Sequence, residues 1–317
     1  MLTKLADMKR IISLIFLLVG FLTFAWAQEE TVEETVVEKD KPVRSPFESG
    51  YLIDQQTSVI KVPKTLEFVI QHKFGTVENG RSDLWGIYAP GANIRLGLNY
   101  VVAKNLQAGW GITKKNMYND FNLKWTLLEQ TRQNTIPVSV TLYGNVAIDS
   151  RSKKIFEEQQ YWHSSDPDGV HTLHEYRWSQ RLSYFSQLII GRKFGEKLSL
   201  QAGASFSHYN LVDHTGDHDK IAAHLGGRFK FSPQSSLLFN FDLPLKIKNI
   251  SEQREWTNHP KENLALGWEI STSTHAFQIY ISAADGIVPQ DMVMFNQNDW
   301  KNKGLCMGFV ITRLWNF

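Results

Sequence analysis

The sequence predicts an all-β protein, a transmembrane antiparallel up-and-down β-barrel of about twelve strands. Three observations support this prediction. Apolar and polar residues alternate along most of the chain after residue 64, the links between the alternating segments are short and long in turn, and the chain ends on an aromatic residue, Phe317. Strict alternation gives a strand two unlike faces, as a wall between lipid and a polar interior requires.

The first 27 residues are predicted to be a cleaved secretory signal peptide. Basic residues precede an apolar run at 11–24, and Ala25 and Ala27 form a small-residue cleavage site. The apolar run is shorter than the roughly 20 residues that a membrane-spanning helix needs. The segment is therefore expected to direct secretion and to be absent from the mature protein.

Net charge and cysteine content exclude two classes of protein. The formal net charge is only +2, whereas a nucleic-acid-binding protein would carry a clear basic excess. Cys306 is the only cysteine, so an internal disulfide is impossible and the region after the leader offers no thiol for a lipid anchor. We expect no nucleic-acid partner and no cofactor.

Residues 28–48 are predicted to form an acidic, flexible periplasmic extension. The segment is rich in Glu with Val interspersed and closes on Pro42 and Pro46, so it cannot bury enough apolar surface to fold alone. It either stays free or docks to a periplasmic partner. The barrel domain is assigned to residues 49–317, with 47–63 expected as a transitional piece at the mouth.

Twelve segments carry the alternating pattern. In the ninth segment, for example, Leu237, Phe239 and Phe241 face one way while Asn240 and Asp242 face the other. The predicted strands are 66–75, 94–102, 106–112, 121–127, 138–148, one within 176–194, 198–209, 221–231, 237–247, 264–272, 277–283 and 304–317.

The links between these strands are sorted by length. Short ones follow the even strands, at 103–105, 131–136, 195–197, 233–235 and 273–275. Long ones follow the odd strands, at 75–91, 113–120, 150–175, 211–220, 248–262 and 285–303. This sorting is typical of an outer-membrane barrel with periplasmic turns and extracellular loops.

The last strand resembles the final strand of bacterial outer-membrane barrels. Trp315 and Phe317 lie on its apolar face, and terminal aromatics of this kind are part of the signal that the barrel-assembly machinery reads. With Tyr100, Phe229 and Phe277 they predict an aromatic girdle at the membrane interface. Membrane lipid and the assembly machinery are therefore the expected partners.

A wider resemblance covers residues 46–317. The stretches TLEFVIQHKFG (65–75) and NIRLGLNYVVAKNLQAGWG (93–111) carry it most specifically. They look like an uncharacterised family of Gram-negative membrane-bound β-barrel proteins. The resemblance implies fold and location, and it supplies neither a substrate nor catalytic residues.

Charged residues also fall on the inward face. The predicted interior set is Arg95, Lys124, Arg181, Arg228, Asp242 and Glu269, and a wider set adds Glu67, His224, Lys230, Lys246 and Lys248. Mixed inward charges allow two alternatives, an interior plugged by paired side chains or a narrow water-filled channel. We predict a narrow passive channel for small solutes, leaning toward anions and gated by the loop at 150–175. A non-conducting barrel that presents its loops and its N-terminal arm is the alternative.

No motif predicts catalysis or a metal site. The loop at 213–219 is rich in His and Asp but lacks a defensible ligand spacing, and the loop histidines His163, His171 and His174 are interpreted in the same way. A twelve-stranded outer-membrane phospholipase is the one enzymatic precedent. Residues 162–166 do not match its motif, and no outward serine lies beside a histidine, so no enzymatic activity is expected.

Overall fold

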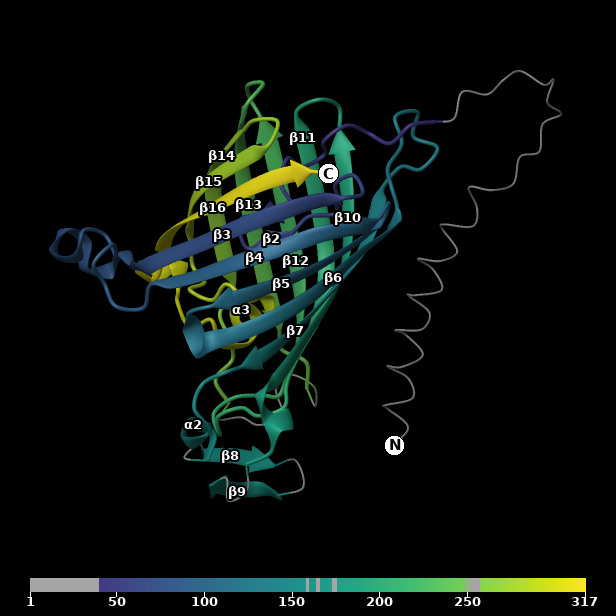
Figure 1. Cartoon of the computed structure of the whole chain (residues 1–317). Coiled ribbons are helices and arrows are strands. Elements are labelled where there is room, and N and C mark those ends of the chain that lie inside the picture. The colour runs from purple at the N-terminus through teal and green to yellow at the C-terminus, as the bar shows by residue number, and fades with distance from the viewer. Residues whose placement is uncertain (1–39, 158–159, 164–165, 173–175, 249, 251–256) are drawn as a thin grey trace. The chain divides into compact units, whose positions relative to one another are not determined.

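Twelve antiparallel strands close into a barrel in the computed structural model of the chain (Figure 1). The structure describes residues 40–317 except 158–159, 164–165, 173–175, 249 and 251–256. The predicted signal peptide and residues 28–39 of the predicted extension lie outside the described residues.

The wall follows the predicted up-and-down order. Its strands are β3 (Thr65–Thr76), β4 (Asn93–Ala103), β5 (Leu106–Thr113), β6 (Tyr118–Leu128), β7 (Ser139–Asp149), β10 (Leu182–Phe194), β11 (Leu198–Tyr209), β12 (Asp219–Lys230), β13 (Ser235–Leu245), β14 (Asn263–Ser271), β15 (His275–Ser282) and β16 (Cys306–Asn316). Each strand pairs with the next in the wall, and β16 pairs with β3 to close it. Closure removes the unpaired strand edges that lipid would not tolerate.

The two faces of the wall have opposite chemistry, as the alternation predicts. On β6, Leu123 and Trp125 point outward and are half exposed, whereas Asp120 and Lys124 point inward and are fully buried. A water-soluble β-protein would place these residues the other way round, because apolar side chains avoid water. The apolar outer face is therefore suited to lipid.

The two ends of the barrel differ. The turn end, where short links join the strands, also carries the C-terminus (Figure 1). The loop end carries longer links with their own short elements: η1 (Val77–Asp83), η2 (Lys115–Met117), α2 (Lys153–Glu157), β8 (Gln160–His163), β9 (Asp166–Thr172), η3 (Trp178–Arg181), α3 (Pro289–Phe295) and η4 (Trp300–Asn302). No helix in the described part is long and apolar enough to cross a membrane.

The segment at 47–63, which we call the plug, extends into the barrel and does not merely cover its mouth: residues 49–58 are buried, whereas Val62 is 64% exposed. Its short hairpin pairs β1 (Tyr51–Leu52) with β2 (Gln55–Gln56). Phe47, Leu52 and Ile53 are almost completely buried and pack against inward residues of the wall. We expected a transitional piece at the mouth of the barrel, but the segment reaches further in than that. Its apolar side chains are buried by packing against the lumen side of the wall.

Residues 40–48 are also held in place. Pro42 forms an isolated bridge with Thr131, and Asp40 accepts hydrogen bonds from the Gln133 amide and the Thr135 hydroxyl. The described end of the predicted extension is thus fixed to the turn between β6 and β7.

The C-terminal aromatics lie on the outer face at the turn end. Trp315 is partly exposed and Phe317 largely exposed. Arg313 also points outward, where its guanidinium stacks over the Trp315 ring at 5.1 Å and contacts His275. These contacts give the one outward cation of this strand a polar and aromatic environment.

Candidate functional site

Amide side chains of the wall bind the backbone of the plug. Gln278 on β15 accepts a hydrogen bond from the Ile53 amide at 2.9 Å and donates one to the Tyr51 carbonyl at 2.9 Å. Gln201 on β11 donates to the Gln56 carbonyl at 2.8 Å. β1 and β2 pair with each other, and these side-chain amides bind the backbone groups that the hairpin itself leaves free. The buried backbone of the plug therefore stays hydrogen-bonded.

The tip of the plug carries a buried ion pair. Asp54 lies 2.7 Å from the Lys73 ammonium of β3, and both side chains are almost fully buried. The other oxygen of Asp54 accepts hydrogen bonds from Ser282 at 2.6 Å and Asn263 at 3.1 Å. Since each acceptor of the carboxylate is used, the charge is well compensated in its buried position.

A second set of charges holds the plug at the turn end. Arg228 donates to Glu48 at 2.9 Å and lies 3.7 Å from Glu269 on β14. Lys61 donates to the Glu48 carbonyl at 2.6 Å. Burial lowers the pKa of Lys61, and the nearby carboxylates of Glu67 and Glu48 oppose that change.

Arg95 and Lys124 bridge the plug to the middle of the wall. Arg95 forms two hydrogen bonds with Asp120, at 2.8 and 2.6 Å, and contacts the Tyr51 hydroxyl at 3.4 Å. Lys124 donates to the Gly50 carbonyl at 3.2 Å. The bidentate pairing fixes the guanidinium in one plane, so Arg95 can support the plug without leaving a charge unpaired.

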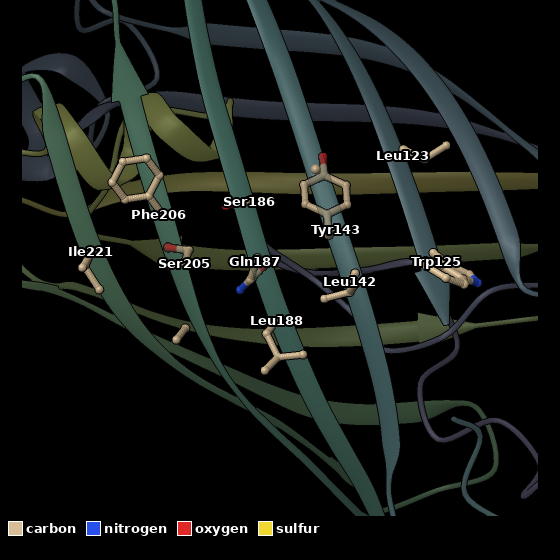
Figure 2. A pocket seen from close by; sticks show the side chains of 12 residues that line it. Leu123, Trp125, Leu142, Tyr143, Ser186, Gln187, Leu188, Ser205, Phe206 and Ile221 are labelled. Atoms are coloured by element: carbon tan, nitrogen blue, oxygen red, sulfur yellow. The ribbon is translucent and has the colours of Figure 1, made fainter. Parts of the chain in front are cut away.

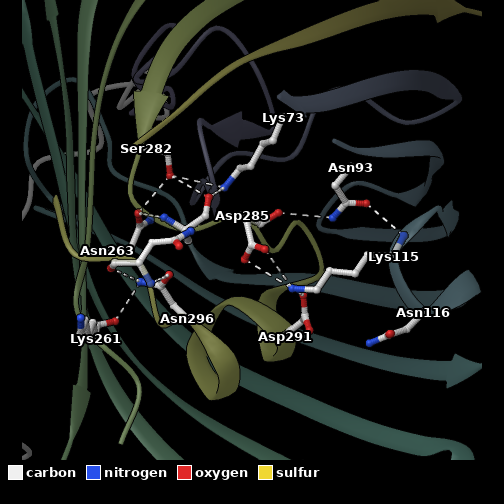
Figure 3. A network of polar contacts seen from close by, with 12 residues as sticks. Lys73, Asn93, Lys115, Asn116, Lys261, Asn263, Ser282, Asp285, Asp291 and Asn296 are labelled. Atoms are coloured by element: carbon white, nitrogen blue, oxygen red, sulfur yellow. Dashed lines mark hydrogen bonds and ion pairs between the residues drawn. The ribbon is translucent and has the colours of Figure 1, made fainter. Parts of the chain in front are cut away.

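Helix α3 fills the lumen from the loop end. It contacts β10, β11, β12 and β13, and its residues 290–294 are buried. Gln290 donates to Asn145 at 3.0 Å, which fixes the helix to β7. Lys115 of η2 tethers the same loop through Asp285 and Asp291, at 3.3 and 3.2 Å (Figure 3).

The tether changes the titration of both partners. Burial raises the pKa of Asp291, while the Lys115 charge opposes the increase. For Lys115, burial acts to lower the pKa, but the carboxylates of Asp291 and Asp285 outweigh it and the net pKa is raised. The charged form of Lys115 is therefore favoured while α3 is docked.

The plug and α3 meet inside the barrel. The Asn263 amide donates to Asp54 of the plug at 3.1 Å and lies 3.6 Å from the Met292 sulfur of α3. The lumen is therefore occupied from both ends in this conformation. Of the two interiors left open by the sequence, the structure has the one with paired side chains, now extended by a plug and a helix.

The predicted interior residues fall into two groups. Arg95, Lys124, Arg228, Asp242 and Glu269 lie buried in the lumen. Arg181 does not: it lies on η3 before β10, is partly exposed, and contacts the Phe156 ring and the carbonyl oxygens of Asp149 and Arg151.

The wider set and the predicted gate also need correction. Lys246 and Lys248 are exposed because β13 already ends at Leu245, and Lys230 is only partly buried at the turn end. In the loop predicted as the gate, α2 packs Phe156 against Leu211, and the described backbone beyond it forms the β8–β9 hairpin. The loop element found inside the lumen is α3.

Several lumen residues were missed by sequence reasoning. Lys73 continues the polar set of Glu67 and Gln71 on β3, so the alternation could have identified it. Asp120 lies one residue before the predicted start of its strand. The plug and α3 give no comparable signal, because both are too short to show a period.

An open groove of about 600 Å³ on the outer face is lined mainly by apolar residues, including Leu123, Trp125, Leu188 and Phe206, and also by Gln187 and Ser205 (Figure 2). Within the described residues, no three His, Cys, Asp or Glu side chains are grouped to hold a metal ion.

One family profile describes the same architecture. A family profile described as "Membrane bound beta barrel domain (DUF5777)" matches residues 47–315. No curated protein sequence matches the chain. Among solved structures, an outer-membrane channel from Pseudomonas putida F1 is 13% identical with a TM-score of 0.44, over 81% of this chain and 97% of that one. The NanC porin is 7% identical with a TM-score of 0.45, over 79% and 99%.

Proposed function

The chain belongs to the family of membrane-bound β-barrel domains, and on that premise we propose that it is an outer-membrane channel for small hydrophilic solutes, closed at rest by its own N-terminal segment. The observation that carries the proposal is the way the plug is held. Its backbone and charges bind polar side chains of the wall, including Gln278, Gln201 and Lys73.

A polar wall is what a lumen needs if it is to fill with water after the plug leaves. Buried polar groups are no more stabilising than well-packed apolar residues, and an ion pair is often less so. A permanently filled barrel would therefore be served better by an apolar interior. Barrels of eight strands are just filled by side chains, whereas those of sixteen or more leave an open channel; twelve strands leave room for a removable filler.

The wall charges favour weak ion selectivity. The buried wall residues Lys73, Arg95, Lys124, Lys220 and Arg228 oppose Glu67, Asp120, Asp242 and Glu269. The anion preference expected from the sequence counted Arg181, Lys246 and Lys248, which lie outside the lumen. We therefore propose a modest preference for anions at most.

The same proposal includes location and orientation. Residues 1–27 act as a secretory signal, the turn end faces the periplasm, and the loops face outward. Trp315 and Phe317 are read by the barrel-assembly machinery, and a periplasmic partner binds the acidic extension at 28–48.

A non-conducting barrel is the second candidate. It is favoured by the pairing of Lys73 with Asp54, Arg95 with Asp120 and Arg228 with Glu48. A fully compensated interior needs no water to solvate its charges.

Conductance separates the two candidates. In planar bilayers, wild-type protein should give rare channel steps, and a variant lacking residues 49–60 should give frequent ones. A variant lacking residues 28–39, which keeps the whole plug, is the matched control and should behave like wild type. If the plug-less protein still folds, as judged by heat-dependent gel mobility, but gives no steps, the channel proposal must be replaced by the non-conducting barrel.

A further inference from the structure

Three neighbouring strands bring a serine, a histidine and an aspartate together inside the lumen. His224 on β12 lies directly opposite Asp242 on β13, and Ser205 lies on the adjacent β11. The Nδ1 atom of His224 is 2.7 Å from Oδ1 of Asp242, and its Nε2 atom is 2.7 Å from Oγ of Ser205. All three side chains are buried: the exposed fraction is 4% for Ser205, 6% for His224 and 2% for Asp242.

The carboxylate decides the tautomer of the imidazole. Carboxylate oxygens accept hydrogen bonds, so in the 2.7 Å contact Nδ1 of His224 is the donor and Asp242 the acceptor. Its Nε2 atom is then unprotonated and accepts the hydrogen bond from the Ser205 hydroxyl. This is the arrangement in which a histidine acts as general base toward a serine.

Asp242 is held so that it can fix that imidazole. Its Oδ1 atom also accepts a hydrogen bond from Gln55 of the plug at 2.7 Å, and Oδ2 accepts one from Asn263 at 2.9 Å. These contacts fix the orientation of the carboxylate, so Asp242 is a positioning residue for His224.

A donor for a developing oxyanion is also present. Gln187 lies directly opposite Ser205 in the β10–β11 register and is 94% buried, with an exposed fraction of 6%. No hydrogen bond of its side chain is formed within the described residues. Its Nε2 atom would lie 3.4 Å from a Cβ at Gly203, so the amide lies over the glycine that pairs with His224. Side-chain amides of this type stabilise oxyanions of acyl transfer.

The surroundings indicate the kind of acyl group. The Phe185 ring packs against His224 with a centroid distance of 6.4 Å, and Phe185 clusters with Ala222 and Met292. The other members of this cluster are also apolar or aromatic side chains. A small apolar acyl group fits such a wall better than a charged one.

We propose that Ser205 is the nucleophile of a second activity of this barrel, the hydrolysis of small esters with apolar acyl groups. The Ser205 Oγ atom forms a bond to the carbonyl carbon while its proton passes to Nε2 of His224. The carbonyl electron pair moves to the oxygen, which the Gln187 amide stabilises. Collapse expels the alkoxide, which takes the proton from His224, and water activated by His224 then releases the acid and restores Ser205.

This inference revises the expectation of no enzymatic activity, which rested on the lack of an outward serine beside a histidine. The structure brings the two together on the inward face. Access depends on α3, because its Met292 belongs to the same cluster and the helix packs on β11 and β12. Loosening α3 should therefore increase the reaction of Ser205 whether or not the barrel conducts ions.

Covalent labelling tests the nucleophile. Phenylmethanesulfonyl fluoride should modify Ser205 of the full chain, detected by intact mass and peptide mapping. The rate should rise in Lys115→Ala, which releases the tether of α3, and fall about 100-fold or more in His224→Gln, which lacks the base. Ser207→Ala, which changes the next inward serine of β11, is the matched control and should label like wild type.

Turnover of 4-nitrophenyl butyrate tests the remaining roles. Ser205→Ala should fall to the uncatalysed rate, and Gln187→Ala should lose roughly 100-fold in kcat. Asp242→Asn should lower kcat with little change in KM, whereas a merely structural role would not separate the two. The inference is overturned if Ser205 stays unlabelled in both wild type and Lys115→Ala, or if labelling is unaffected in His224→Gln.

Discussion

Removing the charge at the tip of the plug should open the barrel. Asp54→Ala leaves the Lys73 ammonium, which is 2.7 Å from the carboxylate and almost fully buried, without its ionic partner. Breaking one partner of a buried ion pair costs about 3–5 kcal/mol. The substitution also removes the acceptor used by Ser282 and Asn263. Since about 1.4 kcal/mol is a factor of ten, the released plug should become roughly 100- to 4,000-fold more populated.

The measurement is channel activity in planar bilayers, supported by alkylation of the single thiol. Cys306 is buried on the lumen side of β16, opposite Ser282 of β15, so maleimide should reach it faster once the plug tip has left. Asp54→Ala should therefore raise both the step frequency and the alkylation rate.

Two further variants separate charge from simple damage. Asp54→Leu combined with Lys73→Met removes both charges and should return the barrel to its closed behaviour, because replacing a whole buried pair by apolar residues is often neutral. Lys153→Ala breaks an exposed i,i+4 pair with Glu157 and should change nothing measurable. The reasoning is refuted if folded Asp54→Ala stays closed, or if the double variant is as open as the single one.

Two other outcomes follow from the ends of the barrel. Deleting residues 315–317 removes the Trp315–Leu66 and Asn316–Thr65 pairings that help close β16 on β3, so the amount of protein in the outer membrane should collapse. Deleting residues 29–39 should leave that amount normal, and an immunoblot of washed membranes measures both. Docking of α3 should weaken as pH rises. The pKa of Asp291 is raised in the docked state, so its contribution to docking is lost as pH rises from its ordinary value of 3.8 through its docked pKa. The pKa of Lys115 is also raised, so its contribution is complete below 10.5 and is lost as pH rises through its docked pKa. The alkylation rate of Cys306 should thus rise with pH more steeply than that of a free thiol standard, and Lys115→Ala should remove the loss above 10.5.

The wall of this barrel could be predicted from the sequence because its physics is local. A strand between lipid and a polar lumen must alternate, and in β13 the alternation of Leu237, Phe239 and Phe241 with polar residues fixes both the strand and its orientation. Sorted links then fix the topology. The inward position of Arg95 and Asp242 follows from the same period.

The contents of the lumen could not be predicted in this way. The hairpin of the plug has strands of two residues, and α3 has seven, so neither reaches the length at which a period is visible. Arg181 was misplaced because η3 interrupts the chain before β10, and a count of alternate residues does not register such a break. The meeting of Ser205 with His224 needs the register between two strands, which alternation alone leaves undetermined.

The way the plug is bound explains why its release and the polarity of the lumen belong together. Two paired strands of two residues are far too small to be stable alone, so the hairpin exists only while Gln278, Gln201 and their neighbours satisfy its backbone. The amides that hold the plug are the amides that would face water once it leaves, and water can satisfy them equally well. A wall of leucine would hold an apolar plug more firmly but would resist wetting after release. The polar wall therefore makes exchange between plug and water thermodynamically accessible.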